Sequence, residues 1–164
     1  MYERIAVALD GSEIAETALT HVAELAERLD AEVVLIRVVH AVTELGGEPP
    51  ELPSAAVITP EAVATVRVQE ETAEAEAYLA EISTGLNRKG VHSISVLRAG
   101  PVARGIIAAA VEHGCDLIAI TEYGAGGAHT RRDRNVFGGV ADEVLRTSPL
   151  PVLIVRPWAE IGHD

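Results

Sequence analysis

The chain has 164 residues, a length suited to one domain with a full core, and its formal net charge is −12. This acidic balance argues against general binding to nucleic acid or to an anionic membrane, because both need a positive protein surface. Hydrophobic residues make up 48% of the chain but aromatic residues only 3%, so we expect a core of Val, Ile, Leu and Ala.

The sequence favours a cytoplasmic protein. No apolar run approaches the roughly 20 residues of a membrane span. The opening residues, MYERIAVALD, lead directly into a strand and mix acidic with basic side chains, unlike a signal peptide. Cys115 is the only cysteine, which leaves no intramolecular disulfide, and its place just before an apolar strand suggests an inert core thiol.

Apolar patterning predicts five strands alternating with four helices. Strands are expected at residues 4–9, 32–40, 92–98, 117–120 and 151–156. Helices are expected after Asp10–Ser12, from Pro60 to about Lys89, after Gly100–Pro101, and from Gly138–Gly139. Residues 41–59 contain two glycines and three prolines and are predicted to form a mobile loop. The order predicts one open, doubly wound α/β domain at residues 1–157, followed by a tail at 158–164.

A glycine-rich loop at residues 124–137 separates the fourth strand from the last helix. It begins with Gly124, Gly126 and Gly127 and continues with three arginines. Strand, glycine loop and helix N-terminus together favour phosphate binding, because free amides and the helix dipole attract an anion and glycine lets it come close. The plainer alternative is a mobile surface loop whose glycines only allow turns.

The predicted topology brings three segments to one edge of the sheet. In an open parallel sheet, ligands bind beyond the carboxyl ends of the strands where the strand order reverses. Residues 8–10, 38–39 and 121–127 follow the first, second and fourth strands. We therefore expect them to converge on one binding cleft.

No pattern in the sequence predicts a dedicated enzyme. The six histidines are scattered, and neither a G-x-S-x-G elbow nor a Walker lysine is present. The acidic run Glu70, Glu71, Glu74 and Glu76 is interpreted as a solvated helix face rather than a metal site. We expect no catalytic residue and no metal site, and slow ATP hydrolysis at most.

Four segments resemble the universal stress protein family. They are VALDGSEIAETAL at 7–19, VVLIRVVH at 33–40, AGPVARGI at 99–106, and GGVADEVLRTSPLPVLIVRP at 138–157. The resemblance implies a flavodoxin-like or Rossmann-like five-stranded parallel sheet of the adenine nucleotide alpha hydrolase type. It also implies a homodimer paired through the last strand, Pro151–Arg156, which would cover an exposed apolar edge.

Family members that bind ATP or AMP carry a pattern resembling G-x2-G-x9-G-[S/T] and an aspartate after the first strand. By this resemblance Asp10 would hold the ribose and adenine end of the nucleotide, Ala8 and Val38 would contact adenine, and Mg could accompany ATP. Gly124 and Gly138 match the second and third motif glycines. The implied nucleotide site consists of Ala8, Leu9, Asp10, Val38, Thr121, Gly124, Gly127, Arg131, Gly138, Gly139 and Val140.

The chain departs from the pattern in three places. Thr121 stands where the first glycine belongs, 13 residues rather than nine separate Gly124 from Gly138, and Gly139 replaces the hydroxyl residue. Thr121 introduces a branched side chain, and Gly139 removes one hydrogen bond worth about 0.5–1.5 kcal/mol. An alternative register through Gly124, Gly127 and Gly138 nearly restores the motif but breaks the gapless match through the strand.

Three functions remain open from the sequence. The first is a small regulatory protein of the stress response that binds ATP or AMP at the carboxyl edge of the sheet. The second is a nucleotide-free dimeric interaction module that uses the fold as a scaffold. The third is a regulatory subunit of a transporter or a kinase.

Overall fold

A computed structural model describes residues 2–39, 60–125 and 138–157. Its strands are β1 (Arg4–Ala8), β2 (Glu32–Val39), β3 (Ser93–Ala99), β4 (Leu117–Thr121) and β5 (Val152–Val155). Its helices are α1 (Glu13–Leu29), α2 (Pro60–Arg88), α3 (Val102–Glu112) and α4 (Gly139–Thr147). The predicted order of elements is confirmed. The predicted loop at 41–59, the tail at 158–164 and most of the glycine loop lie outside the described residues.

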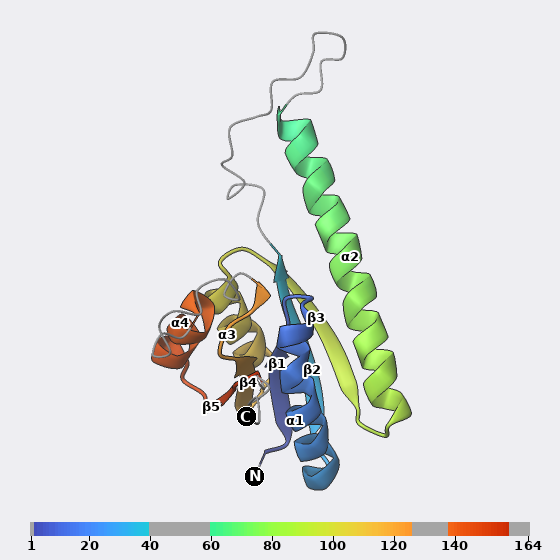
Figure 1. Cartoon of the computed structure of the whole chain (residues 1–164), viewed down its shortest axis with the longest axis vertical. Helices are drawn as coiled ribbons and strands as arrows, with labels where there is room; N and C mark the ends of the chain where they lie inside the picture. The colour runs from blue at the N-terminus through green and yellow to red at the C-terminus, as the bar shows by residue number, and fades with distance from the viewer. Residues whose placement is uncertain (1, 40–59, 126–137, 158–164) are drawn as a thin grey trace, which may run out of the picture.

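All strand pairs are parallel, and the strand order is β3-β2-β1-β4-β5 (Figure 1). The chain moves outward from β1 to β3 in one direction and then returns to add β4 and β5 on the other side of β1. The order therefore reverses between β1 and β4. This arrangement confirms the predicted five-stranded, doubly wound fold and marks the β1–β4 junction as the place where a ligand would bind.

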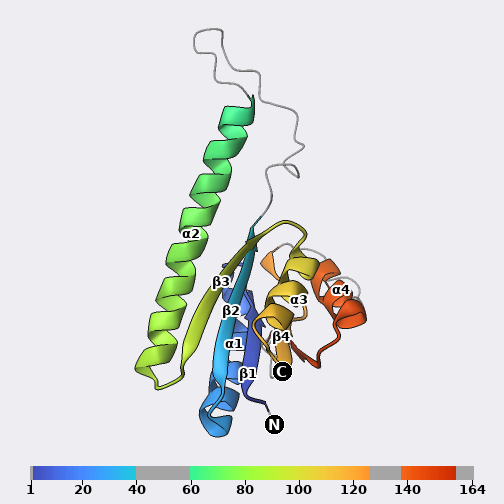
Figure 2. The same ribbon diagram turned by 180° about the vertical axis from the view of Figure 1, so that it is seen from behind.

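Each face of the sheet is covered by two helices (Figures 1 and 2). The central strands are apolar on both sides, as expected for a sheet buried on both faces. Ala18 and Val22 of α1 and Leu79 of α2 join one core cluster with Val33 and Leu35. The second cluster, on the opposite face, contains Ala6, Val34, Ile36 and Ile118 of the strands, Ala103, Ile106, Ala109 and Ala110 of α3, and Ala141 and Val144 of α4.

Helix α2 is longer than the sheet that it covers. Its inner stripe is made by Ala75, Tyr78, Leu79, Ile82 and Leu86, at the spacing of one helical face. The first turns of α2 extend beyond the sheet at the end toward which β2 points (Figures 1 and 2). Within the described residues, no helix combines the length and apolarity needed to cross a membrane.

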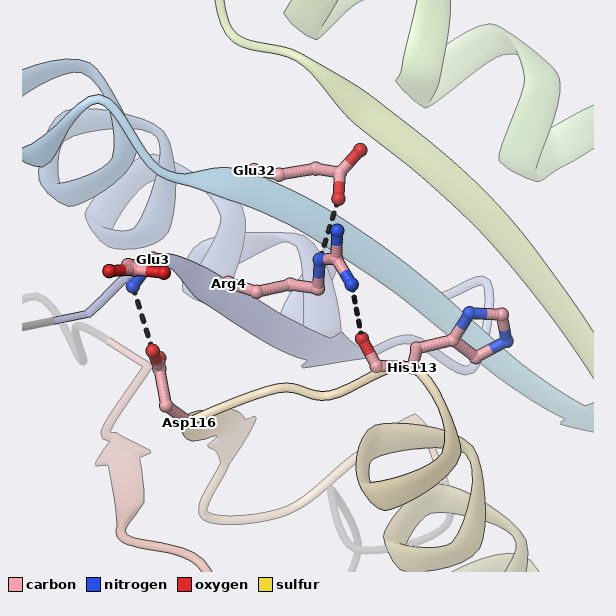
Figure 3. Close-up of polar contacts among 5 residues, drawn as sticks. All are labelled: Glu3, Arg4, Glu32, His113 and Asp116. Carbon is pink, nitrogen blue, oxygen red and sulfur yellow. Dashed lines mark hydrogen bonds and ion pairs between the residues drawn. The ribbon is translucent and has the colours of Figure 1, made fainter.

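Polar contacts within the chain close the amino edge of the sheet (Figure 3). Arg4 forms an ion pair with Glu32, Nε to Oε2, at 2.6 Å, and Nη1 of Arg4 donates to the carbonyl of His113 at 2.6 Å. Asp116 accepts from the amide of Glu3 at 2.8 Å. Cys115 beside them is buried, and this burial raises the pKa of its thiol to about 11. The cysteine is therefore a core thiol, as predicted.

Candidate functional site

The site begins with the turn at residues 10–12, between β1 and α1. Gly11 has a φ of +86°, which glycine adopts without strain. The turn lets Ser12 cap α1, because its Oγ accepts from the amide of Ala15 at 3.2 Å. Asp10 in turn accepts from the Ser12 amide at 2.9 Å and from the Ser12 hydroxyl at 2.6 Å, both at Oδ1. Ser12 is therefore the N-cap of α1.

A hydrogen bond from beyond β4 completes the environment of the Asp10 carboxylate. The amide of Ala125 donates to Oδ2 of Asp10 at 2.9 Å. The preceding residue packs against the same oxygen, since a Cβ added at Gly124 would lie 2.1 Å from it. The turns after β1 and β4 are thus joined at the reversal point of the sheet, as predicted, and Gly124 is required there for close approach.

These contacts determine the charge state of Asp10. Burial raises the pKa of its carboxyl, but the hydrogen bonds from the Ser12 side chain, the Ala125 amide and the Ser12 amide outweigh burial and leave this pKa below its ordinary value of 3.8. Asp10 is therefore ionised at neutral pH. It retains an exposed surface from which it can accept further hydrogen bonds.

Val38 and Ala8 lie on the same face of the sheet, the face covered by α3 and α4. Val38 is half-buried near the end of β2, and Ala8 is buried at the end of β1. Helix α3 packs closely against Val38 at Gly105, where an added Cβ would lie 2.9 Å from Cγ2 of Val38. The next residue after β1, Leu9, is buried in the opposite cluster, and its amide donates to the Ile36 carbonyl at 2.9 Å.

The N-terminus of α4 lies against the turn that follows β4. Gly138 donates its amide to the carbonyl of Glu122 at 2.9 Å, and an added Cβ would lie 3.2 Å from that carbonyl oxygen. Gly138 supplies no side-chain cap, so the first amides of α4 are not bonded by a capping side chain. Among the described residues, none lies within 4 Å of a Cβ added at Gly139, and Val140 is 37% exposed. This helix end can accept an anion.

Thr121 differs from the other predicted site residues. It is only 4% exposed and pairs with Val155 of β5. Successive strand residues point to opposite faces, and its neighbour Ile120 belongs to the α3 and α4 side, so Thr121 points toward the α1 side. Its branched side chain is therefore directed away from the face that carries Ala8 and Val38.

The structure brings the predicted residues after β1 and β4 into direct contact and places Val38, Gly138, Gly139 and Val140 at the same edge of the sheet. Gly127 and Arg131 lie outside the described residues. Sequence reasoning missed Ala125, whose amide bonds Asp10, and Gly105, which packs on Val38. It also missed Arg37 and Tyr78, which lie beside the Asp10 turn. The sequence signal that could have singled out Arg37 was its charge among apolar residues of the predicted strand.

The contact between Gly124 and Asp10 gives a first prediction. In Gly124→Ala, the new methyl group would displace the Asp10 carboxylate and break its bond with Ala125, so we expect a loss of about 1 kcal/mol in the free energy of unfolding at neutral pH. The pKa of Asp10 should rise toward 3.8, as measured by NMR titration. A carboxyl whose pKa is lower in the folded than in the unfolded state stabilises the fold at pH values above the unfolded pKa, and this stabilisation is lost as the pH falls through the folded pKa. The difference in unfolding free energy between the wild type and Gly124→Ala should therefore shrink as the pH falls through the folded pKa of Asp10.

Gly139→Ala is the matched control, since a methyl group there meets open space. It should be neutral or slightly stabilising, because alanine favours the helix more than glycine. Equal destabilisation of both variants, or an unchanged Asp10 titration in Gly124→Ala, would contradict the proposed contact.

Comparison with known proteins agrees with this architecture. Residues 1–156 match the model of the universal stress protein family. A universal stress protein from Burkholderia pseudomallei has 28% identity and a TM-score of 0.68, over 96% of this chain and 97% of its own. UspA from Lactobacillus plantarum has 22% identity and a TM-score of 0.76, over 94% and 98%.

A third solved relative is a universal stress family protein from Arabidopsis thaliana with AMP bound. It has 16% identity and a TM-score of 0.65, over 99% of this chain and 96% of its own. A search of curated proteins gives no match. The family match covers almost the entire chain and agrees with the strand order and the β1–β4 junction described above. The chain therefore belongs to the universal stress protein family.

Proposed function

We propose that this protein is a small regulatory protein that binds ATP or AMP at the carboxyl edge of its sheet. The observation that carries the proposal is the joining of the turns after β1 and β4 through Asp10 and Ala125. This joint lies where the strand order reverses, the place where open parallel sheets bind nucleotides.

Solved relatives support an adenine nucleotide as the ligand class. The Arabidopsis protein named above has AMP bound. Another universal stress protein, 17% identical with a TM-score of 0.60, is in complex with cAMP. Both ligands contain adenine, ribose and phosphate, and the described residues offer a suitable partner for each part.

Ala8 and Val38 would contact adenine, and the ionised carboxylate of Asp10 would accept from a ribose hydroxyl. The phosphates would meet the free amides at the N-terminus of α4, from Gly139 and Val140, near Gly124. No group of three acidic, His or Cys side chains within the described residues could hold a metal ion. A Mg²⁺ ion would therefore be carried by the phosphates of ATP.

The first test measures nucleotide affinity by calorimetry in the wild type and in Asp10→Ala. We expect wild-type binding of AMP or ATP, and at least about tenfold weaker binding in the variant because a charged acceptor is lost. Glu13→Ala is the control, since it removes an equal, exposed charge three residues away. It should bind as the wild type does.

Absorbance of the denatured protein would reveal any copurified nucleotide, and added ATP should raise the melting temperature if it binds. No bound nucleotide and no thermal shift would overturn the proposal. The alternative would then be a nucleotide-free dimeric module, such as a regulator of a transporter or a kinase. Equal losses in Asp10→Ala and Glu13→Ala would remove Asp10 from the site.

The open space at Gly139 gives a second test. Gly139→Ser supplies the hydroxyl that the family pattern has at this position, and no residue that the structure describes lies within 4 Å of a Cβ added there. We expect AMP affinity to increase by about tenfold, which corresponds to one added hydrogen bond to a phosphate. Gly139→Ala shares the backbone effect but lacks the hydroxyl and should leave affinity unchanged. If serine gives no more affinity than alanine, the phosphates do not lie at this helix end.

We also propose a homodimer paired through β5. This strand is at the edge of the sheet and is only partly buried from Val152 to Ile154. Its residues 151 and 155 bond β4 through their carbonyls, to the amides of Ile118 and Glu122. Because backbone groups alternate in direction along a strand, the amides of Val152 and Ile154 face away from β4 and are free to pair with a second copy.

Ile154→Pro tests this pairing, because it removes an outward amide while leaving the bonds to β4 intact. We expect a dimer for the wild type and for Ile154→Ala, and a monomer for Ile154→Pro, by light scattering after size-exclusion chromatography. The unfolding transition of each variant confirms that it is folded. A monomeric wild type, or a folded Ile154→Pro that remains dimeric, would contradict pairing through β5.

A further inference from the structure

Arg37 is a charged residue near the end of β2, and apart from Glu32 at its start the other residues of this strand are apolar. It lies on β2 in alternation with Val33 and Leu35, which belong to the core on the α1 and α2 face. Its guanidinium covers the open side of Gly11. An added Cβ at Gly11 would lie 2.9 Å from Nη1, 3.2 Å from Cζ and 3.3 Å from Nη2 of Arg37. The guanidinium therefore supports the turn that presents Asp10.

Tyr78 of α2 holds the same guanidinium. The Cζ atom of Arg37 lies 5.4 Å from the centroid of the Tyr78 ring, within the range of a cation–π interaction. Arg37 thus connects α2 with the Asp10 turn, through Tyr78 at one end and Gly11 at the other.

The electrostatic surroundings of Tyr78 include the site itself. Burial raises the pKa of its phenol, Glu16 of α1 and then Asp10 raise it further, and Arg37 acts in the opposite direction. The hydroxyl oxygen is buried and, among the residues that the structure describes, has no well-aligned hydrogen-bond partner. Glu16 therefore acts on it mainly through its charge. The phenol stays neutral, so the ring faces Arg37 as an uncharged aromatic surface.

We propose that Arg37 and Tyr78 are positioning residues, which hold the Asp10 turn in its binding geometry. Through them, nucleotide affinity would depend on the position of α2 against the sheet. This inference rests on the proposed nucleotide site and identifies what controls it. Displacement of α2 would weaken the support of Gly11, and Asp10 would then lose its alignment with the amides of Ser12 and Ala125. A partner that binds α2 could therefore change nucleotide affinity without touching the site.

The experiment compares Tyr78→Leu, Tyr78→Phe and Arg37→Met with two matched controls. Tyr78→Leu removes the ring but no charge. Tyr2→Leu makes the same change at another tyrosine packed against the same core cluster. Arg28→Met removes a positive charge from an exposed arginine at the end of α1. Three quantities are measured for each variant: the AMP dissociation constant, the titration midpoint of Asp10 by NMR, and the melting temperature.

We expect Tyr78→Leu and Arg37→Met to weaken AMP binding by about tenfold and to raise the Asp10 midpoint toward 3.8. Tyr78→Phe keeps the ring and should preserve both values. The double variant Arg37→Met/Tyr78→Leu should lose no more affinity than either single variant, because the two residues act in one chain of contacts. Tyr2→Leu should lower the melting temperature while leaving affinity and midpoint unchanged.

The Asp10 midpoint is measured without ligand, so it separates this inference from the proposed function. A wild type that binds no AMP would refute the nucleotide proposal, and the midpoint would still decide the positioning role. An unchanged midpoint and affinity in Tyr78→Leu, with a melting temperature lowered as in Tyr2→Leu, would overturn the inference and leave a packing role only. If Tyr78→Leu does not fold, Arg37→Lys, which keeps the charge but loses the planar group, must show the same shifts in smaller degree.

Discussion

The structure of the candidate site depends on one carboxylate that bonds in two directions. Oδ1 of Asp10 accepts from Ser12 at the start of α1, and Oδ2 accepts from Ala125 beyond β4. Strands β1 and β4 are neighbours in the sheet but far apart in sequence. The part of the chain that starts with β1 builds one side of the sheet, and the part that starts with β4 builds the other. Asp10 therefore connects the turn after β1 with the turn after β4.

The two edges of the sheet use their polar groups differently. At the amino edge, Arg4 bonds with Glu32 and His113, and Oδ2 of Asp116 accepts from the amide of Glu3. The other oxygen of Asp116, Oδ1, is buried without a hydrogen-bond partner among the described residues. At the carboxyl edge, the amides at the start of α4 have no side-chain cap. The polar groups of the amino edge thus bond mainly within the chain, whereas the N-terminal amides of α4 are the groups that the proposed nucleotide would bond.

The order of elements was predictable because four strands are apolar runs, the third strand alternates polar and apolar residues, and each helix repeats its apolar residues at helical spacing. The meeting of Asp10 with the turn after β4 followed from topology, without any side-chain detail. Sequence could not show that Gly124 packs on the carboxylate, because this depends on the path of the turn in space. The contact between Arg37 and Tyr78 could not be predicted either, because no local sequence pattern determines the path of the residues that separate them.

The departures from the family's nucleotide pattern have unequal consequences in this structure. Thr121 is buried and directed to the α1 face, so its branched side chain does not project on the side of Ala8 and Val38. Gly139 lacks a hydroxyl but leaves space around the first turn of α4. The proposed nucleotide site would thus keep its adenine and ribose contacts and lack one phosphate contact. If the proposed nucleotide binds, its affinity would come from adenine, from ribose and from backbone amides rather than from a phosphate-binding side chain.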